Sequence, residues 1–104
     1  MAESSQTVSS VAERYASSLF DLALENGSVA EVASALDRFQ ALLDQSEDLQ
    51  RLIKSPVFSA DEQVKALGAV LAKAKIEGLA AKFLNVVAAN RRLFAVPQMI
   101  RAFR

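Results

Sequence analysis

The sequence VAERYASSLFDLA, residues 11–23, indicates the fold class of this chain. Its apolar residues recur at intervals of three and four, which is the repeat of one helical face and not the alternation of a strand. The pattern predicts a helix over residues 7–26. Gly27 is expected to close it, because glycine readily adopts the left-handed conformation found after many helices. Residues 1–6 are expected to form a flexible N-terminus.

The same helical spacing continues through residues 29–45, a short helix after Ser46, residues 60–73, residues 76–90, and a last helix with Pro97 in its first turn. Ser28 and Ser59 each stand three residues before a Glu, which is the spacing of a capping box. Pro56 is expected to stop the short helix, whereas nothing in residues 73–75 forbids a continuous helix. No strand-like alternation occurs. The sequence therefore predicts an all-α, compact six-helix bundle over residues 7–104.

The composition supports one packed domain. Half of the residues are hydrophobic (52%), which is enough for a core. We expect Leu36, Phe39, Leu43 and Leu67 in that core, and Met99, Ile100 and Phe103 facing inward. Residues 101–104 stand in mid-helix without a cap, so the chain is expected to be part of a longer protein.

Charge is unevenly distributed along the chain. Residues 1–50 hold 9 acids and 2 bases, and residues 51–104 hold 3 acids and 10 bases, so the halves carry −7 and +7. One interpretation is that the halves pack together and offset their fields. The other is that the second half presents a basic patch to an acidic partner.

The residue types argue against a catalytic or metal site. Cys and His are both absent, which removes thiolate metal ligands and the commonest general base. The acid pairs at 47–48 and 61–62 each begin a helix, where the helix dipole explains them. No catalytic, cofactor-binding or metal-binding residue is predicted. No apolar run approaches the ~20 residues that cross a bilayer, so a cytoplasmic chain without membrane insertion is expected.

Two helices carry more apolar surface than a bundle helix needs. Besides a main stripe, the helix over residues 7–26 has a second one formed by Ala12, Ala16, Phe20 and Ala23. The helix over residues 76–90 is apolar on most of its circumference. Two such helices side by side could form a groove for an amphipathic partner helix. The alternative is that both are simply buried in the core.

Three blocks of sequence resemble the ATP synthase delta subunit family, which includes the oligomycin sensitivity-conferring protein. They are VAERYA at residues 11–16 with LF at 19–20, LIKSP at 52–56 with Lys65 beyond it, and FL at 83–84 followed by NRRL at 90–93 and Pro97. Their order and spacing agree with the family over the whole chain.

The resemblance implies a non-catalytic domain of the peripheral stalk (stator) of the proton-translocating ATP synthase. A six-helix N-terminal domain would grip the amphipathic N-terminal helix of an alpha subunit between the first and fifth helices, on top of the catalytic head. A separate C-terminal domain, absent here, would contact the b subunits. The complex would place the chain at the inner face of the plasma membrane. The partner-binding residues expected on the two helices are Ala12, Tyr15, Ala16, Leu19, Leu79, Phe83, Val86 and Val87.

Several positions allow two interpretations. Arg14 is either a solvated charge or has a partner or interhelix role, and Tyr15 is either a core aromatic or part of the site. Residues 90–92 are expected to shape the corner before the last helix; alternatively, Arg91 or Arg92 touches the partner.

Two other functions remain open. An enzyme of the helical-bundle type could bind a dianionic substrate with Arg14, Arg51, Lys82 and Arg92. A helical nucleic-acid binder could use the basic second half, and the loss of affinity with salt would mark it.

Overall fold

Six α-helices follow one another in the computed structural model, which describes residues 2–55 and 57–103, with side chains from Ser10 onward. They are α1 (Ala2–Glu25), α2 (Val29–Gln45), α3 (Glu47–Lys54), α4 (Ala60–Ala74), α5 (Gly78–Ala89) and α6 (Val96–Phe103), and the 3₁₀ turn η1 (Leu93–Ala95) precedes the last. The predicted all-α six-helix bundle is confirmed for this part of the chain. The first helix starts at Ala2, earlier than the predicted residue 7.

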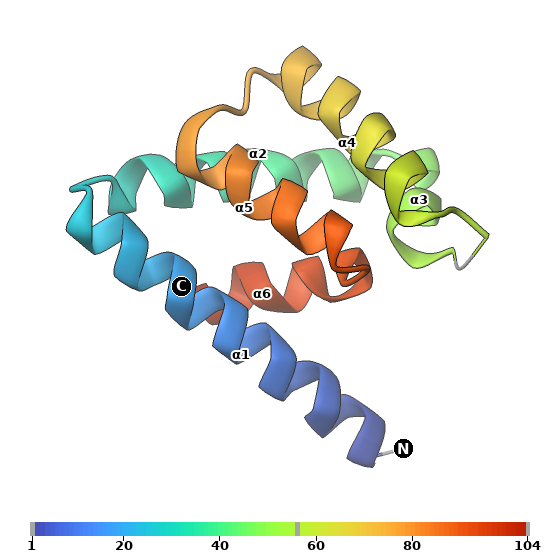
Figure 1. The fold of residues 1–104 in the computed structure, drawn as a ribbon, viewed down its shortest axis with the longest axis horizontal. Helices are drawn as coiled ribbons and strands as arrows, with labels where there is room; N and C mark the ends of the chain where they lie inside the picture. The colour runs from blue at the N-terminus through green and yellow to red at the C-terminus, as the bar shows by residue number, and fades with distance from the viewer. Residues whose placement is uncertain (1, 56, 104) are drawn as a thin grey trace.

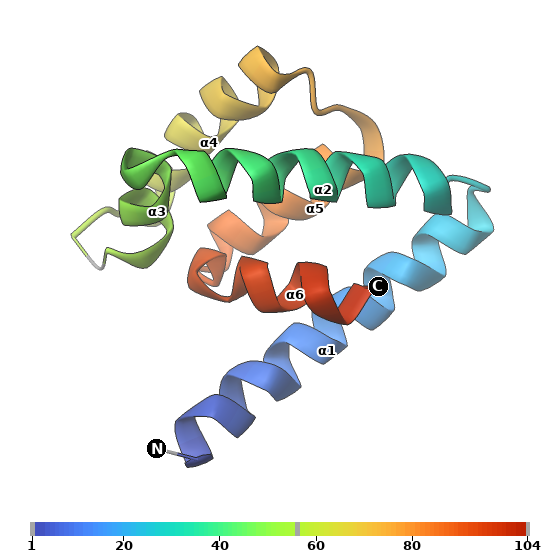
Figure 2. The same cartoon turned by 180° about the vertical axis from the view of Figure 1, so that it is seen from behind.

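The helices pack in pairs around one core. The most extensive contacts join α1 to α6 and α4 to α5, while α2 lies against both α5 and α6 (Figures 1 and 2). The radius of gyration of 13.0 Å is that of a folded domain of this length. All seven of the residues predicted to lie in the core or to face inward are buried: Leu36, Phe39, Leu43, Leu67, Met99, Ile100 and Phe103.

The corner between α1 and α2 is closed by backbone hydrogen bonds. Gly27 has φ +63°, its N–H donates to the Leu24 carbonyl, and the Ser28 N–H donates to the Ala23 carbonyl over 2.8 Å. These are the two bonds of a Schellman motif, and they confirm Gly27 as the end of the helix. The predicted capping box at Ser28 is wrong, because its side chain makes no capping hydrogen bond. The closure of α1 holds Ser28 at φ −122°, ψ 22°, outside the extended conformation usual for a capping residue.

The second predicted capping box does form. The Glu62 N–H donates to Ser59 Oγ over 3.1 Å, and the Ser59 N–H donates to Glu62 Oε1 over 2.8 Å. These reciprocal bonds satisfy two amide groups at the start of α4 that have no partner within the helix. They also lower the pKa of the Glu62 carboxyl, chiefly through the bond from the Ser59 backbone.

Two further helix ends are closed by residues that the sequence did not mark. Lys75 (φ 58°) follows α4, and the N–H of the next residue, Ile76, donates to the Leu71 carbonyl. Arg91 (φ 60°) follows α5, and the N–H of Arg92 donates to the Val87 carbonyl in the same way. The backbone of both residues adopts the left-handed conformation, which is uncommon outside Gly and Asn. Because the closure at Lys75 leaves Ile76 in the link, α5 begins at Gly78 and not at residue 76.

Long polar side chains join consecutive helices at their ends. Gln50 Nε2 donates to the Leu43 carbonyl of α2, and the buried Gln63 Nε2 donates to the Leu52 carbonyl of α3 over 3.1 Å. Carbonyls near a helix C-terminus have no partner within the helix, so these bonds stabilise the ends and fix α3 between α2 and α4. Helix α3 ends at Lys54. Pro56, which was predicted to stop this helix, lies outside the residues that the structure describes.

Ser59 and Ser28 form a matched pair for measuring the value of a cap. The Ser59→Ala variant is expected to lose about 1 kcal/mol of unfolding free energy. The Ser28→Ala variant should change it by less than about 0.5 kcal/mol, because the buried Ser28 hydroxyl has no hydrogen-bond partner. Urea denaturation followed by circular dichroism measures both, and equal losses would contradict the assignment.

The lowered pKa of Glu62 predicts a pH-dependent contribution to stability. A carboxyl whose folded pKa lies below its unfolded value of 4.5 stabilises the fold above that value and loses its contribution as the pH falls through the folded pKa. The Glu62→Gln variant should therefore be less stable than the parent chain at about pH 7 and equally stable below about pH 3. Urea denaturation at both pH values tests this, and a difference that does not change with pH would refute it.

Candidate partner-binding groove

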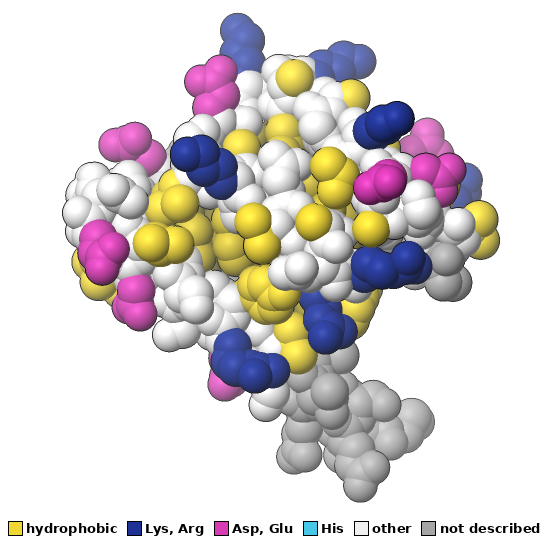
Figure 3. Space-filling view, viewed as in Figure 1, with side chains coloured by type: hydrophobic (Ala, Val, Ile, Leu, Met, Phe, Trp, Pro, Cys, Tyr) yellow, Lys and Arg dark blue, Asp and Glu magenta, His cyan; other side chains and the backbone are white. Residues whose placement is uncertain are grey.

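An apolar groove runs between α1 and α5, with a volume of about 400 Å³. In Figure 3 apolar side chains gather in this hollow, and both basic and acidic side chains stand around it. The groove is lined by four residues from each helix: Tyr15, Ser18, Leu19, Leu22, Leu79, Lys82, Phe83 and Val86.

The groove stays open because α1 and α5 each pack elsewhere. α1 directs its small side chains into the bundle, where Ala12, Ala16 and Ala23 are buried and the helix lies against α6. α5 packs against α4 in the same way, with Ala80 and Ala88 buried. Neither helix covers the other, so Leu22 remains 46% exposed and Val86 52% exposed. Both helices therefore expose apolar surface that the core does not cover, so the alternative that both are simply buried in the core is wrong.

The structure separates the eight expected site residues into two groups. Tyr15, Leu19, Leu79, Phe83 and Val86 line the groove, although Leu19 is only 2% exposed and also belongs to the core. Ala12, Ala16 and Val87 lie in the core instead, at most 3% exposed, because they stand on the sides of α1 and α5 that face the bundle. Their expected place on the groove wall is corrected accordingly.

Three groove residues were not among the expected ones: Ser18, Leu22 and Lys82. The sequence held a signal for them. In both helices the lining residues stand at positions i, i+3, i+4 and i+7, starting from Tyr15 and from Leu79. This repeat is one continuous helical face. Apolar periodicity alone does not mark its polar members Ser18 and Lys82, whereas Leu22 belongs to the apolar stripe of the first helix.

An aromatic pair and a hydrogen bond fix the groove at one end. The rings of Tyr15 and Phe83 meet edge to face, with centroids 6.3 Å apart. Asn90 Nδ2 donates to the Tyr15 hydroxyl oxygen over 3.1 Å, although the two residues are 75 positions apart in the sequence. Tyr15 is half-buried and thus serves the packing of α1 on α5 and the groove together. Asn90, which follows α5, shapes the corner as predicted.

A polar hollow continues the groove beyond Tyr15. It has a volume of about 320 Å³ and is lined by Val11, Arg14, Tyr15, Ser18 and Arg92. Of the other two cations considered for an enzyme, Lys82 lines the apolar groove and Arg51 pairs with Asp48 on α3 at 3.8 Å. All four are exposed, so they do not converge in a closed pocket.

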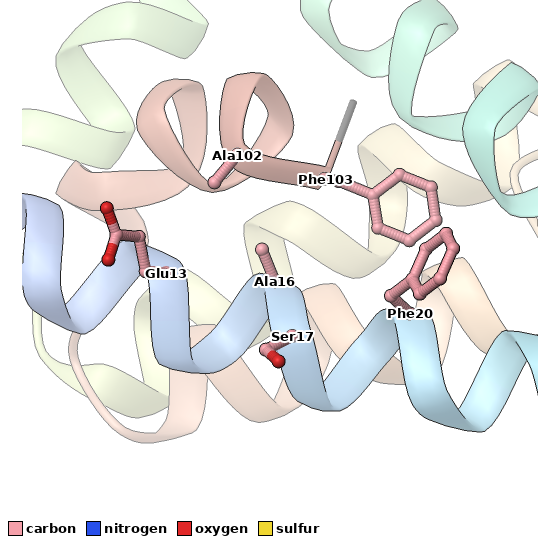
Figure 4. A pocket seen from close by; sticks show the side chains of 6 residues that line it. All are labelled: Glu13, Ala16, Ser17, Phe20, Ala102 and Phe103. Atoms are coloured by element: carbon pink, nitrogen blue, oxygen red, sulfur yellow. The ribbon is translucent and has the colours of Figure 1, made fainter.

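A separate hollow lies between α1 and α6, on another side of α1. It is lined by Glu13, Ala16, Ser17, Phe20, Ala102 and Phe103. Figure 4 shows the rings of Phe20 and Phe103 next to each other there, and they meet edge to face with their centroids 5.6 Å apart. The ring contact fastens the end of α6 to α1, while Phe20 remains 37% exposed.

Among the residues with described side chains, no three acids come close enough together to hold a metal ion. Over the described part of the chain, no helix has the length and apolar character that crossing a membrane requires.

The fold and groove can be set beside known proteins. A family model described as "ATP synthase delta (OSCP) subunit" matches residues 11–104. The chain belongs to the ATP synthase delta (OSCP) subunit family. Relatives named "ATP synthase subunit delta" include those of Chelativorans sp. (strain BNC1), 66% identical, Agrobacterium fabrum, 65%, and Rhizobium leguminosarum bv. trifolii, 64%. Each match covers all 104 residues of this chain and 55–56% of the relative.

The chain thus spans about half the length of these relatives. The described residues form an all-helical bundle with an apolar groove between α1 and α5.

Val86 and Val87 are neighbours with opposite environments, which makes them a matched pair. Replacing the buried Val87 with Ala is expected to cost about 2 kcal/mol of unfolding free energy, since two buried methyl groups are lost and a cavity remains. Replacing the half-exposed Val86 with Ala should change it by less than about 0.5 kcal/mol. Urea denaturation measures both, and a comparable loss at Val86 would mean that the groove is closed.

Proposed function

We propose that this chain is a non-catalytic stator domain of the rotary ATP synthase, and that its α1–α5 groove binds the N-terminal amphipathic helix of an alpha subunit. The observation that carries the proposal is the apolar groove with Leu22 and Val86 exposed on its two walls. Membership of the delta (OSCP) family supports the choice of complex.

The groove has the form that a helical ligand requires. Its α1 wall extends from Tyr15 to Leu22, which is about 10 Å along the helix axis, or two turns. A partner helix presents side chains at i, i+3, i+4 and i+7 over the same length. Apolar anchors of such a helix would fill the space between the two walls, where six of the eight lining residues are apolar or aromatic.

Burial of apolar groups suits the mechanical role of a stator. Rotation of the rotor loads the contact between the head and the stalk, so the contact needs slow dissociation. Differences in affinity between related complexes arise mainly from dissociation rates. The two helices that form the groove are held by Tyr15, Phe83 and Asn90 before any partner arrives, and a preformed site reduces the ordering cost of binding.

The wider assignments follow from the same proposal. The complex would hold the chain at the inner face of the plasma membrane without inserting it into the bilayer. Contacts with the b subunits belong to the part of the longer relatives that this chain does not span. The domain then links the catalytic head to the membrane sector during ATP synthesis.

An NMR titration with a synthetic peptide of the alpha subunit's N-terminal helix, from the same organism, tests the proposal. Saturable shifts are expected at Tyr15, Leu22, Phe83 and Val86. The Leu22→Asp and Val86→Asp variants should each weaken binding at least about tenfold, because each removes apolar burial and places a charge in the groove.

Val57 provides the control, since it is 84% exposed and lies in the link between α3 and α4. The Val57→Asp variant should bind the peptide as the parent chain does. A peptide that binds none of the folded chains at millimolar concentration, or one that shifts residues away from α1 and α5, would overturn the proposal.

A further inference from the structure

The polar hollow at the end of the groove gathers four side chains that can donate hydrogen bonds. It is lined by the side chains of Arg14, Arg92 and Tyr15, and it shares Tyr15 and Ser18 with the apolar groove, so the two are continuous. Asn90 donates to the Tyr15 oxygen. That bond uses one acceptor position of the hydroxyl, whose own hydrogen can still be donated to a ligand.

Backbone geometry fixes one of the two arginines. Arg91 closes α5 with φ 60°, and the N–H of Arg92 bonds to the Val87 carbonyl over 2.9 Å. The start of the Arg92 side chain is therefore set at the end of α5, beside α1. Arg14 stands one residue before Tyr15 on the facing helix, so the two guanidinium groups come from elements that the Tyr15–Asn90 bond holds together.

These two arginines have no acid of their own within the part of the chain that the structure describes. The ion pair between Arg51 and Asp48, at 3.8 Å, lies away from them on α3. Guanidinium groups bind carboxylates with paired, charge-assisted hydrogen bonds. The end of the groove thus offers two unpaired cations and a hydroxyl donor, which together suit a carboxylate.

The opposite end of the groove has the opposite charge. Glu25 follows the lining residue Leu22 by three positions and Asp21 precedes it by one; both acids are exposed, and neither lines the groove itself. About 16 Å along α1 separates Arg14 from Glu25. This exceeds the screening length of about 8 Å at physiological salt, so the two ends act on a partner independently. Lys82 lies between them, on the α5 wall.

We propose that Arg14, Arg92 and the Tyr15 hydroxyl form a carboxylate-binding site that fixes the register and direction of the helix in the groove. The partner is an amphipathic helix with an acidic side chain beyond one end of its apolar stripe, and that end lies over Arg14 and Arg92. Its other end, beside Asp21 and Glu25, is basic or uncharged. This inference rests on the proposed function, whose ligand it defines further.

Charge reversal provides the first test. The Arg14→Glu/Arg92→Glu double variant should bind the alpha-subunit peptide at least about tenfold more weakly than the parent chain, and the salt dependence of its binding should be smaller. The Arg101→Glu variant is the matched control, because Arg101 is exposed on α6 and lines neither hollow. Circular dichroism and thermal unfolding of each variant establish that the fold is retained.

Rescue by the partner provides the second test. Peptides in which each acidic residue is replaced in turn by Lys are titrated against the double variant, and one of them is expected to restore most of the lost affinity. A spin label at the acidic end of the parent peptide should broaden the signals of Arg14 and Arg92. A label at the other end should broaden those of Leu22 and Leu79.

The outcomes separate the two proposals. If the peptide shifts Leu22, Phe83 and Val86 but the double variant binds as tightly as the Arg101→Glu control, the carboxylate site is refuted and the groove assignment stands. If no Lys peptide restores binding, or the acidic end lies beside Glu25, the site is likewise refuted. If the peptide does not bind the parent chain at all, both proposals fail.

Discussion

The close packing of α1 on α6 is the contact on which the rest of the structure depends. Ala12 and Ala16 are buried where the two helices meet, and such small side chains allow a close approach. With α1 held in this way, its larger residues point to either side. Phe20 meets Phe103 on one side, and Tyr15 and Leu22 form the wall of a groove on the other. One helix thereby serves the core and a surface at once.

Short helix closures position the second wall. Gly27 and Arg91 end α1 and α5 with the same pattern of backbone bonds, and no long loop intervenes between α1 and α2 or between α5 and η1. Such closures fix the angle between successive helices, because the bonded amides leave the chain little freedom. The Tyr15–Asn90 bond then joins the two walls directly. The groove is a consequence of how the helices end as much as of how they pack.

An apolar surface and a charged surface adjoin each other along α1, because the groove and the polar hollow share Tyr15 and Ser18. The apolar part of the groove provides burial, which is non-directional and proportional to area. The hollow at Arg14 and Arg92 provides charge, which contributes more to orientation than to affinity. A helix bound to the apolar part alone could slide by a turn or lie in either direction. In the proposed complex, the adjoining charges at Arg14 and Arg92 would remove that ambiguity.

The sequence by itself determined the helices, the all-α fold, the core around Phe39 and Leu67, and the capping box at Ser59, because these follow from periodicity and from bonds between near neighbours. It also marked α1 and α5 as too apolar to be ordinary bundle helices. The tertiary structure alone decided which side of each helix stays open. Ala12, Ala16 and Val87 are as apolar as a groove residue could be, yet they are buried, because α6 and the core take that side of each helix. The left-handed closures at Lys75 and Arg91, and the failed cap at Ser28, also became visible only in the structure. Local propensity cannot specify which side of a helix stays open, since the packing of distant segments decides it.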